Sequence, residues 1–336
     1  MKIKSAYLKS PWQFEVRSVE LPDTPPEGKA LIRVEACGIC GTDLSAAAGK
    51  TAEWQAFGHE VAGVIENISP GHHQLAVGDK VVLESSSFCG TCELCRNGRV
   101  DLCNKAPNIW GQPAMGFAEK MLAPICCLVP SGGLDPETAC LAEPAGVAFD
   151  MVKTANIALG DRVCLVGPGP IGLMAIPLIL RCGGTRVVCI GRSHSKRRLE
   201  IAQALGAEAI ACDGEIDSLT DLKGRFNHVL VTAPVDQIPP SLALLAYGGE
   251  LTYIGIGTGE GKICFDANHF HFQKLQLRAS FASPAIYYPT VLKLLASGLI
   301  PADLIISHRY PLNDIAKAMM TARNDKEGAV KIIVKP

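Results

Sequence analysis

A glycine-rich turn between a strand and a helix constrains this chain more than any other feature. The segment VGPGPIG (166–172) follows the buried-strand pattern DRVCLVG and opens a long apolar helix. Its glycines permit a tight turn, close approach of a pyrophosphate and close helix–sheet packing: Gly167, Gly169 and Gly172. Pro170 suits the first helical turn, where with Ile171 it would lie at the diphosphate. We therefore predict dinucleotide binding, with an ordinary structural turn as the alternative.

The second strand ends without the acidic residue that NAD-binding folds usually carry there. After RVVCIG (186–191) the chain continues with Arg192 and Ser193, and Arg197 lies at the basic start of the next helix. A carboxylate would repel a 2′-phosphate, whereas a guanidinium can bind it bidentately. We therefore predict NADP, bound through Gly191, Arg192, Ser193 and Arg197. NAD, or a solvated basic helix start, is the alternative.

Four cysteines lie close together in CGTCELCRNGRVDLC (89–103), with the spacing C-x2-C-x2-C-x7-C. Two successive x2 gaps let sulfurs converge on one ion, and four thiolates form a closed tetrahedral zinc site. An iron–sulfur cluster and unliganded cysteines are the alternatives, although the x7 gap fits ferredoxin spacing poorly. The predicted ligands of a structural zinc are Cys89, Cys92, Cys95 and Cys103. Cysteines that occur singly in apolar runs are predicted to be buried, among them Cys164, Cys189 and Cys264.

The pattern of elements changes near residue 147. Before it, β-branched runs such as ALIRVEA and VAGVIENI alternate with Gly/Pro turns, which predicts a small β barrel. After it, strands alternate with helices, which predicts a doubly wound parallel sheet; SLALLAYGG is expected to be helical and GELTYIGIG (249–257) a strand. The chain closes with the strand AVKIIVKP. The predicted domain segments are 1–146, 147–282 and 283–336.

Composition excludes several classes of protein. The net formal charge of −1 provides no basic stripe for nucleic acid. The N-terminus, MKIKSAYLKSPWQFEV, has no apolar run typical of a signal peptide. The longest apolar stretch, PIGLMAIPLIL (170–180), is too short to span a bilayer and contains two prolines. We therefore expect a soluble cytoplasmic protein without nucleic-acid or membrane partners.

Two further motifs offer potential metal ligands at turns: EACGICGTD (35–43) and FGHEVAGVIE (57–66). With the four-cysteine segment, VGDKVV (77–82), LAEPAGVA (141–148) and VGPGPIG, in this order, they resemble the zinc-dependent medium-chain dehydrogenases, and most closely the polyol and sugar-alcohol branch. The resemblance covers nearly the whole chain. It implies an α/β protein with a GroES-like β-barrel catalytic domain, formed by the first and last segments, and a Rossmann-type cofactor domain between them.

The resemblance also implies a catalytic zinc with an open coordination position. Its protein ligands would be Cys40, His59 and Glu143. Three mixed ligands leave room for water or an alcohol oxygen. Glu60 would approach the metal or bind its water, and Cys37 is the competing thiol. Thr42 would relay the substrate proton, with a turn-stabilising role as its alternative.

The implied reaction interconverts a secondary alcohol and its ketone by hydride transfer with NADP(H). The substrate would be a polyol or sugar alcohol, with or without a phosphate. Ser45 stands where many relatives carry a histidine, which argues against threonine as substrate. A zinc-independent quinone or enone reductase and a non-enzymatic NADPH-binding protein are the rival interpretations. The family also leads us to expect a homodimer or homotetramer joined through the cofactor domains.

Overall fold

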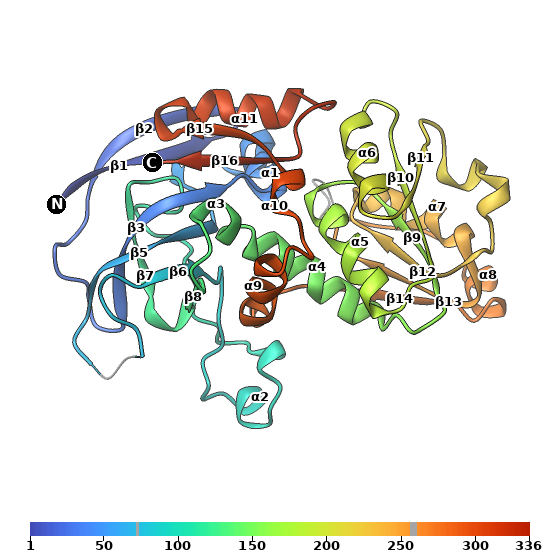
Figure 1. Ribbon diagram of the computed structural model, residues 1–336, viewed down its shortest axis with the longest axis horizontal. Helices are drawn as coiled ribbons and strands as arrows, with labels where there is room; N and C mark the ends of the chain where they lie inside the picture. Colours follow the sequence, from blue (N-terminus) through green and yellow to red (C-terminus); the bar gives the residue numbers. More distant parts are fainter. Residues whose placement is uncertain (72–73, 256–260) are drawn as a thin grey trace. The chain divides into compact units, whose positions relative to one another are not determined.

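The computed structural model describes residues 1–71, 74–255 and 261–336 and divides into two compact units. The first unit is formed by Met1–Gly146, Ala282–Asp325 and Lys331–Pro336, and the second by Val147–Phe281 and Lys326–Val330 (Figure 1). Helix α4 (Ala142–Ala155) begins in the first and continues into the second. Within the described ranges, no helix is long and apolar enough to cross a membrane.

Antiparallel pairing dominates the first unit. One sheet has the order β15-β16-β3-β5-β6-β8, with β7 also paired to β3, and a smaller sheet has the order β2-β1-β4. The strands are β1 (Lys2–Lys9), β2 (Gln13–Glu20), β3 (Lys29–Gly38), β4 (Gln55–Ala56), β5 (Glu60–Ile68), β6 (Lys80–Leu83), β7 (Lys120–Pro124), β8 (Leu128–Pro130), β15 (Ile306–Pro311) and β16 (Lys331–Lys335). The helices are α1 (Gly41–Ser45), α2 (Glu93–Arg96), α3 (Pro136–Ala139), α9 (Tyr288–Ala296), α10 (Ala302–Ile305) and α11 (Ile315–Asn324). These strands form the unit of mainly antiparallel sheet that the alternation of β-branched runs and turns predicts.

Strand register brings three distant segments to one corner of this unit. In the antiparallel pair β3–β5, Gly38 lies opposite Glu60. The residues that follow β3 therefore lie beside those that begin β5. Strand β16 also pairs with β3, with Ile333 opposite Gly38, and the Ile39 N–H donates to the Ile332 carbonyl. The start of β16 thus reaches the same corner.

The second unit is a doubly wound parallel sheet in the order β11-β10-β9-β12-β13-β14. Its strands are β9 (Arg162–Val166), β10 (Arg186–Gly191), β11 (Glu208–Ala211), β12 (Phe226–Val231), β13 (Leu245–Tyr253) and β14 (Gln276–Ala279). Its helices are α5 (Pro170–Cys182), α6 (Lys196–Ala204), α7 (Ile238–Ser241) and α8 (Ala267–Phe272). The central strands are buried on both faces, as expected for a sheet covered by helices on each side. Because β9 has β10 on one side and β12 on the other, their carboxyl ends frame a switch point where ligands bind.

Three local expectations from the sequence are wrong. SLALLAYGG is helical only at its start, because Leu245 already pairs with Phe226 in β13, and strand pairing overrides helix propensity. The predicted strand 249–257 accordingly starts earlier and ends at Tyr253, while its last two residues lie outside the described residues. Cys164 and Cys189 are buried as predicted, but Cys264 is exposed because KICF forms no strand.

Candidate active site and metal-binding groups

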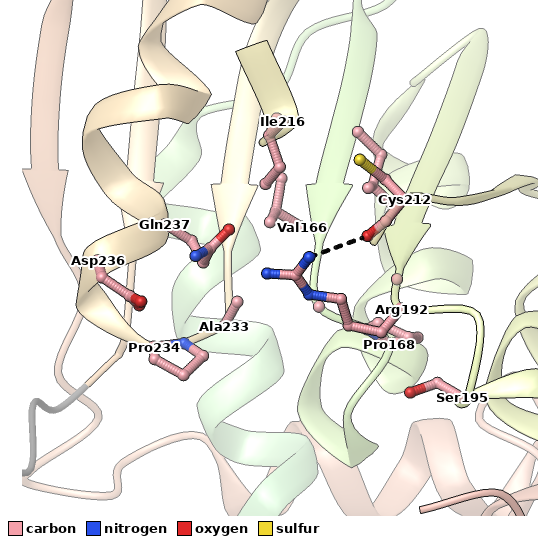
Figure 2. Close-up of a pocket in the computed structure, with 13 residues that line it drawn as sticks. Val166, Pro168, Arg192, Ser195, Cys212, Ile216, Ala233, Pro234, Asp236 and Gln237 are labelled. Atoms are coloured by element: carbon pink, nitrogen blue, oxygen red, sulfur yellow. Dashed lines mark hydrogen bonds between the residues drawn. The ribbon is translucent and has the colours of Figure 1, made fainter. Parts of the chain in front are cut away.

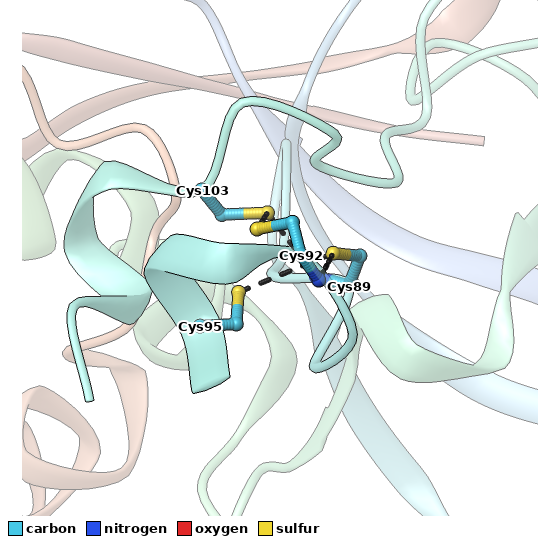
Figure 3. Close-up of side chains that lie close together, drawn as sticks. All are labelled: Cys89, Cys92, Cys95 and Cys103. Carbon is cyan, nitrogen blue, oxygen red and sulfur yellow. Dashed lines mark hydrogen bonds between the residues drawn. The ribbon is translucent and has the colours of Figure 1, made fainter. Parts of the chain in front are cut away.

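The four cysteines of residues 89–103 converge on one point (Figure 3). Their sulfurs all lie within 4.8 Å of one another, and Cys89 Sγ and Cys95 Sγ are 4.0 Å apart. This separation is about twice the length of a disulfide bond, so the sulfurs are free thiols. Helix α2 supplies Cys95, and the short loops on either side supply the others.

Within this cluster, backbone N–H groups favour the thiolate form of Cys89. The N–H groups of Thr91 and Cys92 lower the pKa of Cys89 to about 5, whereas burial raises the pKa of Cys95 to about 12. The Cys89 N–H in turn donates to Cys103 Sγ over 3.3 Å. Four sulfurs around one point, with amide donors directed at them, fit a closed zinc site that has no position for a substrate.

A second group combines different donors at the β3–β5 corner. Cys40 is the N-cap of α1, and His59 comes directly before β5. The Cys40 Sγ, a His59 nitrogen and a Glu60 oxygen lie within 4.8 Å of one another. Burial alone would lower the pKa of His59, but the adjacent Cys40, with Asp43 and Glu143, raises it well above its usual value. A thiol, an imidazole and a carboxylate are zinc ligands, and this group has a mixed composition suited to an open site.

Glu143 lies at the edge of this group, in the first turn of α4. Its Oε1 is 3.9 Å from His59 Nε2. Burial raises the pKa of Glu143 to about 7, although His59 acts in the opposite direction. The tightest set of donors therefore contains Glu60, and Glu143 approaches it from the imidazole side.

Glu60 is already engaged by a buried cation. Lys331 Nζ donates to Glu60 Oε1 over 2.6 Å, to Oε2 over 2.8 Å and to the Ile39 carbonyl over 2.9 Å. Glu60 is fully buried and Lys331 is 2% exposed. Both carboxylate oxygens thus face an ammonium group, which competes with any metal for them. Lys331 is not among the residues predicted from the sequence; its signal there is a charged residue inside the apolar run AVKIIV.

Asp43 is a second residue of this group that was not predicted from the sequence. Its Oδ2 accepts from the Cys40 N–H over 2.9 Å, and its Oδ1 lies 3.8 Å from His59 Nδ1. Burial raises the pKa of this carboxyl group. The Nδ1 atom of His59 is buried and makes no hydrogen bond among the described residues. Asp43 is therefore placed to orient Cys40, and its carboxyl group faces the imidazole.

Cys37, the competing thiol, points elsewhere. It is fully buried, its Sγ donates to the Gly38 carbonyl over 3.7 Å, and burial raises its pKa well above the usual value. A Cβ on Gly116 would lie 2.5 Å from this sulfur, so Cys37 packs against the glycine in the core. In the described part of the chain it belongs to neither convergent group.

Thr42 lies between Cys40 and a cavity of about 510 Å³ in the first unit. Its Oγ1 is 3.6 Å from Cys40 Sγ, and its side chain lines the cavity with Trp54, Phe57 and Trp110. The centroids of the Trp110 and His59 rings are 5.0 Å apart. A small alcohol in this cavity would meet the Thr42 hydroxyl at the end that is nearest the mixed group.

A second cavity, of about 300 Å³, occupies the switch point of the parallel sheet (Figure 2). A Cβ at Gly167 would lie 2.8 Å from the Ala233 amide nitrogen, and one at Gly172 would lie 2.3 Å from the Gly167 carbonyl oxygen. A Cβ at Gly169 would meet open space, so the backbone there is accessible. Helix α5 begins directly after it at Pro170 and Ile171, without a capping side chain. This helix N-terminus therefore offers backbone N–H groups of the kind that bind anions.

Arg192 projects into this cavity from the end of β10 (Figure 2). Its Nη1 donates to the carbonyls of Cys212, Asp213 and Gly214 over 3.4, 2.5 and 3.1 Å. Gly191 leaves room for the ring of Pro168, which would lie 2.6 Å from an added Cβ.

The neighbours of Arg192 differ in their access to the cavity. The Ser193 N–H is held by Asp213 Oδ1 over 2.9 Å. Arg197 is exposed on α6 and does not line the cavity, and Arg198 is bound to the Ala329 carbonyl. Of the four basic residues near the start of α6, only Arg192 lines the cavity; the others are Lys196, Arg197 and Arg198.

Comparison with known proteins covers both units. The alcohol dehydrogenase GroES-like domain model matches residues 26–132, and the zinc-binding dehydrogenase model matches residues 170–297. The chain is 30% identical to L-galactonate-5-dehydrogenase of Escherichia coli (strain K12), over 89% of this chain and 88% of the relative. It is 28% identical to sorbitol dehydrogenase of Bacillus subtilis (strain 168), over 99% and 97%. A zinc-binding dehydrogenase from Sinorhizobium meliloti 1021, solved bound to NADP, superposes with a TM-score of 0.88 at 27% identity, over 100% of both chains.

Proposed function

This chain belongs to the zinc-dependent medium-chain dehydrogenase family and is an alcohol dehydrogenase, and we propose that it reversibly oxidises a secondary hydroxyl of a polyol or sugar alcohol to a ketone, with NADP(H) as cofactor. The observation that carries the proposal is the convergence of thiol, imidazole and carboxyl groups beside the cavity that Thr42 lines. Relatives named for sorbitol and L-galactonate support a polyhydroxylated substrate. The first unit would then be the catalytic domain and the second the cofactor domain.

We assign the catalytic zinc to Cys40, His59 and Glu143. The engagement of both Glu60 oxygens by Lys331 supports Glu143 as third ligand, because Lys331 competes for Glu60. When bound, zinc supplies a Lewis acid to the alcohol oxygen and the nicotinamide accepts the hydride. Asp43 orients Cys40 through its backbone N–H, and the Glu60–Lys331 pair adds no net charge beside the ligands.

Thr42 Oγ1 is proposed to accept the proton that leaves the substrate hydroxyl. Its exposure, and its place between Cys40 and the cavity, support this role. A hydroxyl group can donate and accept at once, so it can pass the proton onward without holding a charge. Trp110 and Phe57 provide apolar surface on the walls of the cavity.

We assign the cysteine cluster to a structural zinc held by Cys89, Cys92, Cys95 and Cys103. Four sulfur donors of one type, placed on a short local segment, support this assignment. Such a site contributes to the folding of its own segment and takes no part in hydride transfer.

NADP preference is proposed through Arg192. Its place in the switch-point cavity and the NADP-bound relative both support this assignment. Bidentate binding of a 2′-phosphate would replace the carbonyl contacts that hold the guanidinium now. Arg192→Ala should lower kcat/KM for NADP by about 10- to 100-fold, with NAD little affected. An equal loss with both cofactors would contradict the assignment.

A homodimer or homotetramer joined through the second units is also proposed. Strand β14 is at the edge of its sheet and therefore offers unpaired backbone groups. Phe272 and Phe281, which flank it in sequence, are 70% and 77% exposed. Phe281→Asp should reduce the mass measured by light scattering towards that of a single chain. An unchanged mass would place the interface elsewhere.

The experiment that tests the function is cofactor reduction by the zinc-replete protein with polyols, sugar phosphates, amino alcohols and simple alcohols, using NADP and NAD in parallel. Turnover of a polyol that chelation abolishes and added zinc restores is the expected result. Turnover that survives complete chelation would favour the zinc-independent reductase instead.

A further inference from the structure

The cavity beside Thr42 is lined by aromatic and polar side chains. Four aromatic side chains line it, those of Tyr7, Trp54, Phe57 and Trp110, and two glutamine side chains line it as well. Indole faces pack against the C–H faces of a polyol while leaving its hydroxyl groups free to form hydrogen bonds. Asp43 is the one acidic residue of the lining, and it is held by the Cys40 N–H. No Lys or Arg is among the described residues that line the cavity.

Two cations, Arg17 and Lys29, contact residues of the cavity lining without lining it themselves, and each has a partner. The Arg17 guanidinium packs over the rings of Tyr7 and Trp54, at 5.0 and 4.5 Å from their centroids, and its Nε is bound to Glu15. Neither Arg17 nor Lys29 belongs to the cavity lining. A phosphate or carboxylate on the substrate would therefore lose its water without gaining a cationic partner, which is unfavourable.

Lys29 fixes the orientation of one glutamine. Its Nζ donates to Gln112 Oε1 over 3.2 Å. Because an ammonium group has donors and no acceptor, the amide must present its oxygen to Lys29. The Gln112 NH₂ is then left as a hydrogen-bond donor with a fixed direction. Gln55, on the same wall, gives its Nε2 to Thr51 Oγ1 over 3.1 Å, which leaves its oxygen as an acceptor.

We propose that this cavity selects an uncharged polyol, and that Gln112, positioned by Lys29, donates a hydrogen bond to a substrate hydroxyl beyond the reacting carbon. The inference rests on the proposed polyol oxidation and makes it specific. Gln112 is a specificity-determining residue and Lys29 a positioning residue. Anionic polyols, such as aldonates and sugar-alcohol phosphates, are predicted to be poor substrates even though one relative is named for L-galactonate.

The first test compares substrates on the full-length, zinc-replete enzyme. The uncharged set is sorbitol, galactitol and L-arabinitol; the anionic set is gluconate, galactonate, arabinonate and sorbitol 6-phosphate; butan-2-ol is the simple alcohol. The best uncharged polyol should exceed the best anionic compound in kcat/KM by at least about tenfold. An anionic compound whose kcat/KM equals that of the best uncharged polyol would overturn this inference. The proposed alcohol dehydrogenase function would still stand. If the enzyme oxidises none of these compounds, the proposed function is contradicted as well.

The second test uses variants. Gln112→Leu should lower the ratio of kcat/KM for the polyol to that for butan-2-ol by about tenfold, mainly through KM, because one hydrogen bond is lost. Lys29→Met should lower the same ratio by about threefold, because the amide can then rotate. Lys29→Arg should restore it. Gln203→Leu, at an exposed glutamine of α6, is the matched control. An unchanged ratio in both Gln112→Leu and Lys29→Met would overturn the role of Gln112.

Discussion

The two candidate metal-binding groups of this chain are built in opposite ways. The cysteine cluster uses four identical donors from residues 89–103, and its own backbone N–H groups direct hydrogen bonds at the sulfurs. The mixed group uses a thiol, an imidazole and carboxyl groups that β3, β5 and α4 bring together from distant parts of the sequence. The first is a local motif that can form with its segment. The second exists only after the strands have paired.

This difference predicts different consequences of losing a donor. The loss of a cluster cysteine should unfold a segment, because the metal substitutes for a hydrophobic core there. The loss of a donor from the mixed group should leave a fold that the strands already hold, while removing the chemistry. The Glu60–Lys331 ion pair is an exception. Loss of either residue should destabilise the fold, because the other would stay buried without its partner.

The largest expected effect is on turnover in the Cys40→Ala variant. Removal of this donor should lower kcat by about 10⁴-fold, because polarisation of the alcohol oxygen is lost. Far-UV circular dichroism and the melting temperature should stay close to those of the wild type. Cys37→Ala is the matched control and should keep its turnover, with a stability loss of about 1 kcal/mol. The opposite pattern in the two variants would assign the ligand to Cys37.

The next largest effect should be on stability, in Lys331→Met. This change leaves Glu60 buried without its cation and should lower the free energy of unfolding by about 4 kcal/mol. Lys335→Met, on the same strand, removes an exposed contact to Glu137 and should cost less than about 1 kcal/mol. Urea denaturation measures both. Equal losses would mean that the buried pair contributes no more than a surface pair.

Cys95→Ser tests the cluster. It should remove one zinc equivalent and lower the free energy of unfolding by about 3 kcal/mol, which corresponds to roughly 10 °C in melting temperature. The folded fraction should keep its kcat within about threefold, because the site is closed to substrate. Complete loss of turnover in a variant that still melts like the wild type would contradict the structural role.

The smallest effect concerns a buried carboxyl group that faces a hydroxyl rather than a cation. Burial raises the pKa of Glu84 from 4.5 to about 7, against the hydrogen bond from Ser87. Between these pH values the folded chain binds more protons than the unfolded chain, so stability falls as pH rises, by about 2 to 3 kcal/mol in total. Glu84→Gln should remove this slope in urea titrations from pH 5 to pH 8. The same slope in both proteins would show that another group carries it.

The sequence predicts those features that depend on neighbours along the chain. The spacing of Cys89 to Cys103 and of the glycines in VGPGPIG sets local geometry, so both segments form the predicted convergence and turn. Lys331 and Asp43 were missed because their roles depend on the register of β16 and β3 and on burial, which no local pattern encodes. The predicted burial of Cys264 was wrong for the same reason, because an apolar run becomes buried only when another strand pairs with it.

The central claim is that one metal group serves catalysis and the other serves folding. Graded chelation of the wild type, with zinc content, turnover and melting temperature measured on the same samples, tests it most directly. The open mixed site should exchange first, so that turnover disappears with the first zinc equivalent while the melting temperature holds, and melting falls only with the second. Turnover and melting temperature that decline together from the first equivalent would contradict the division.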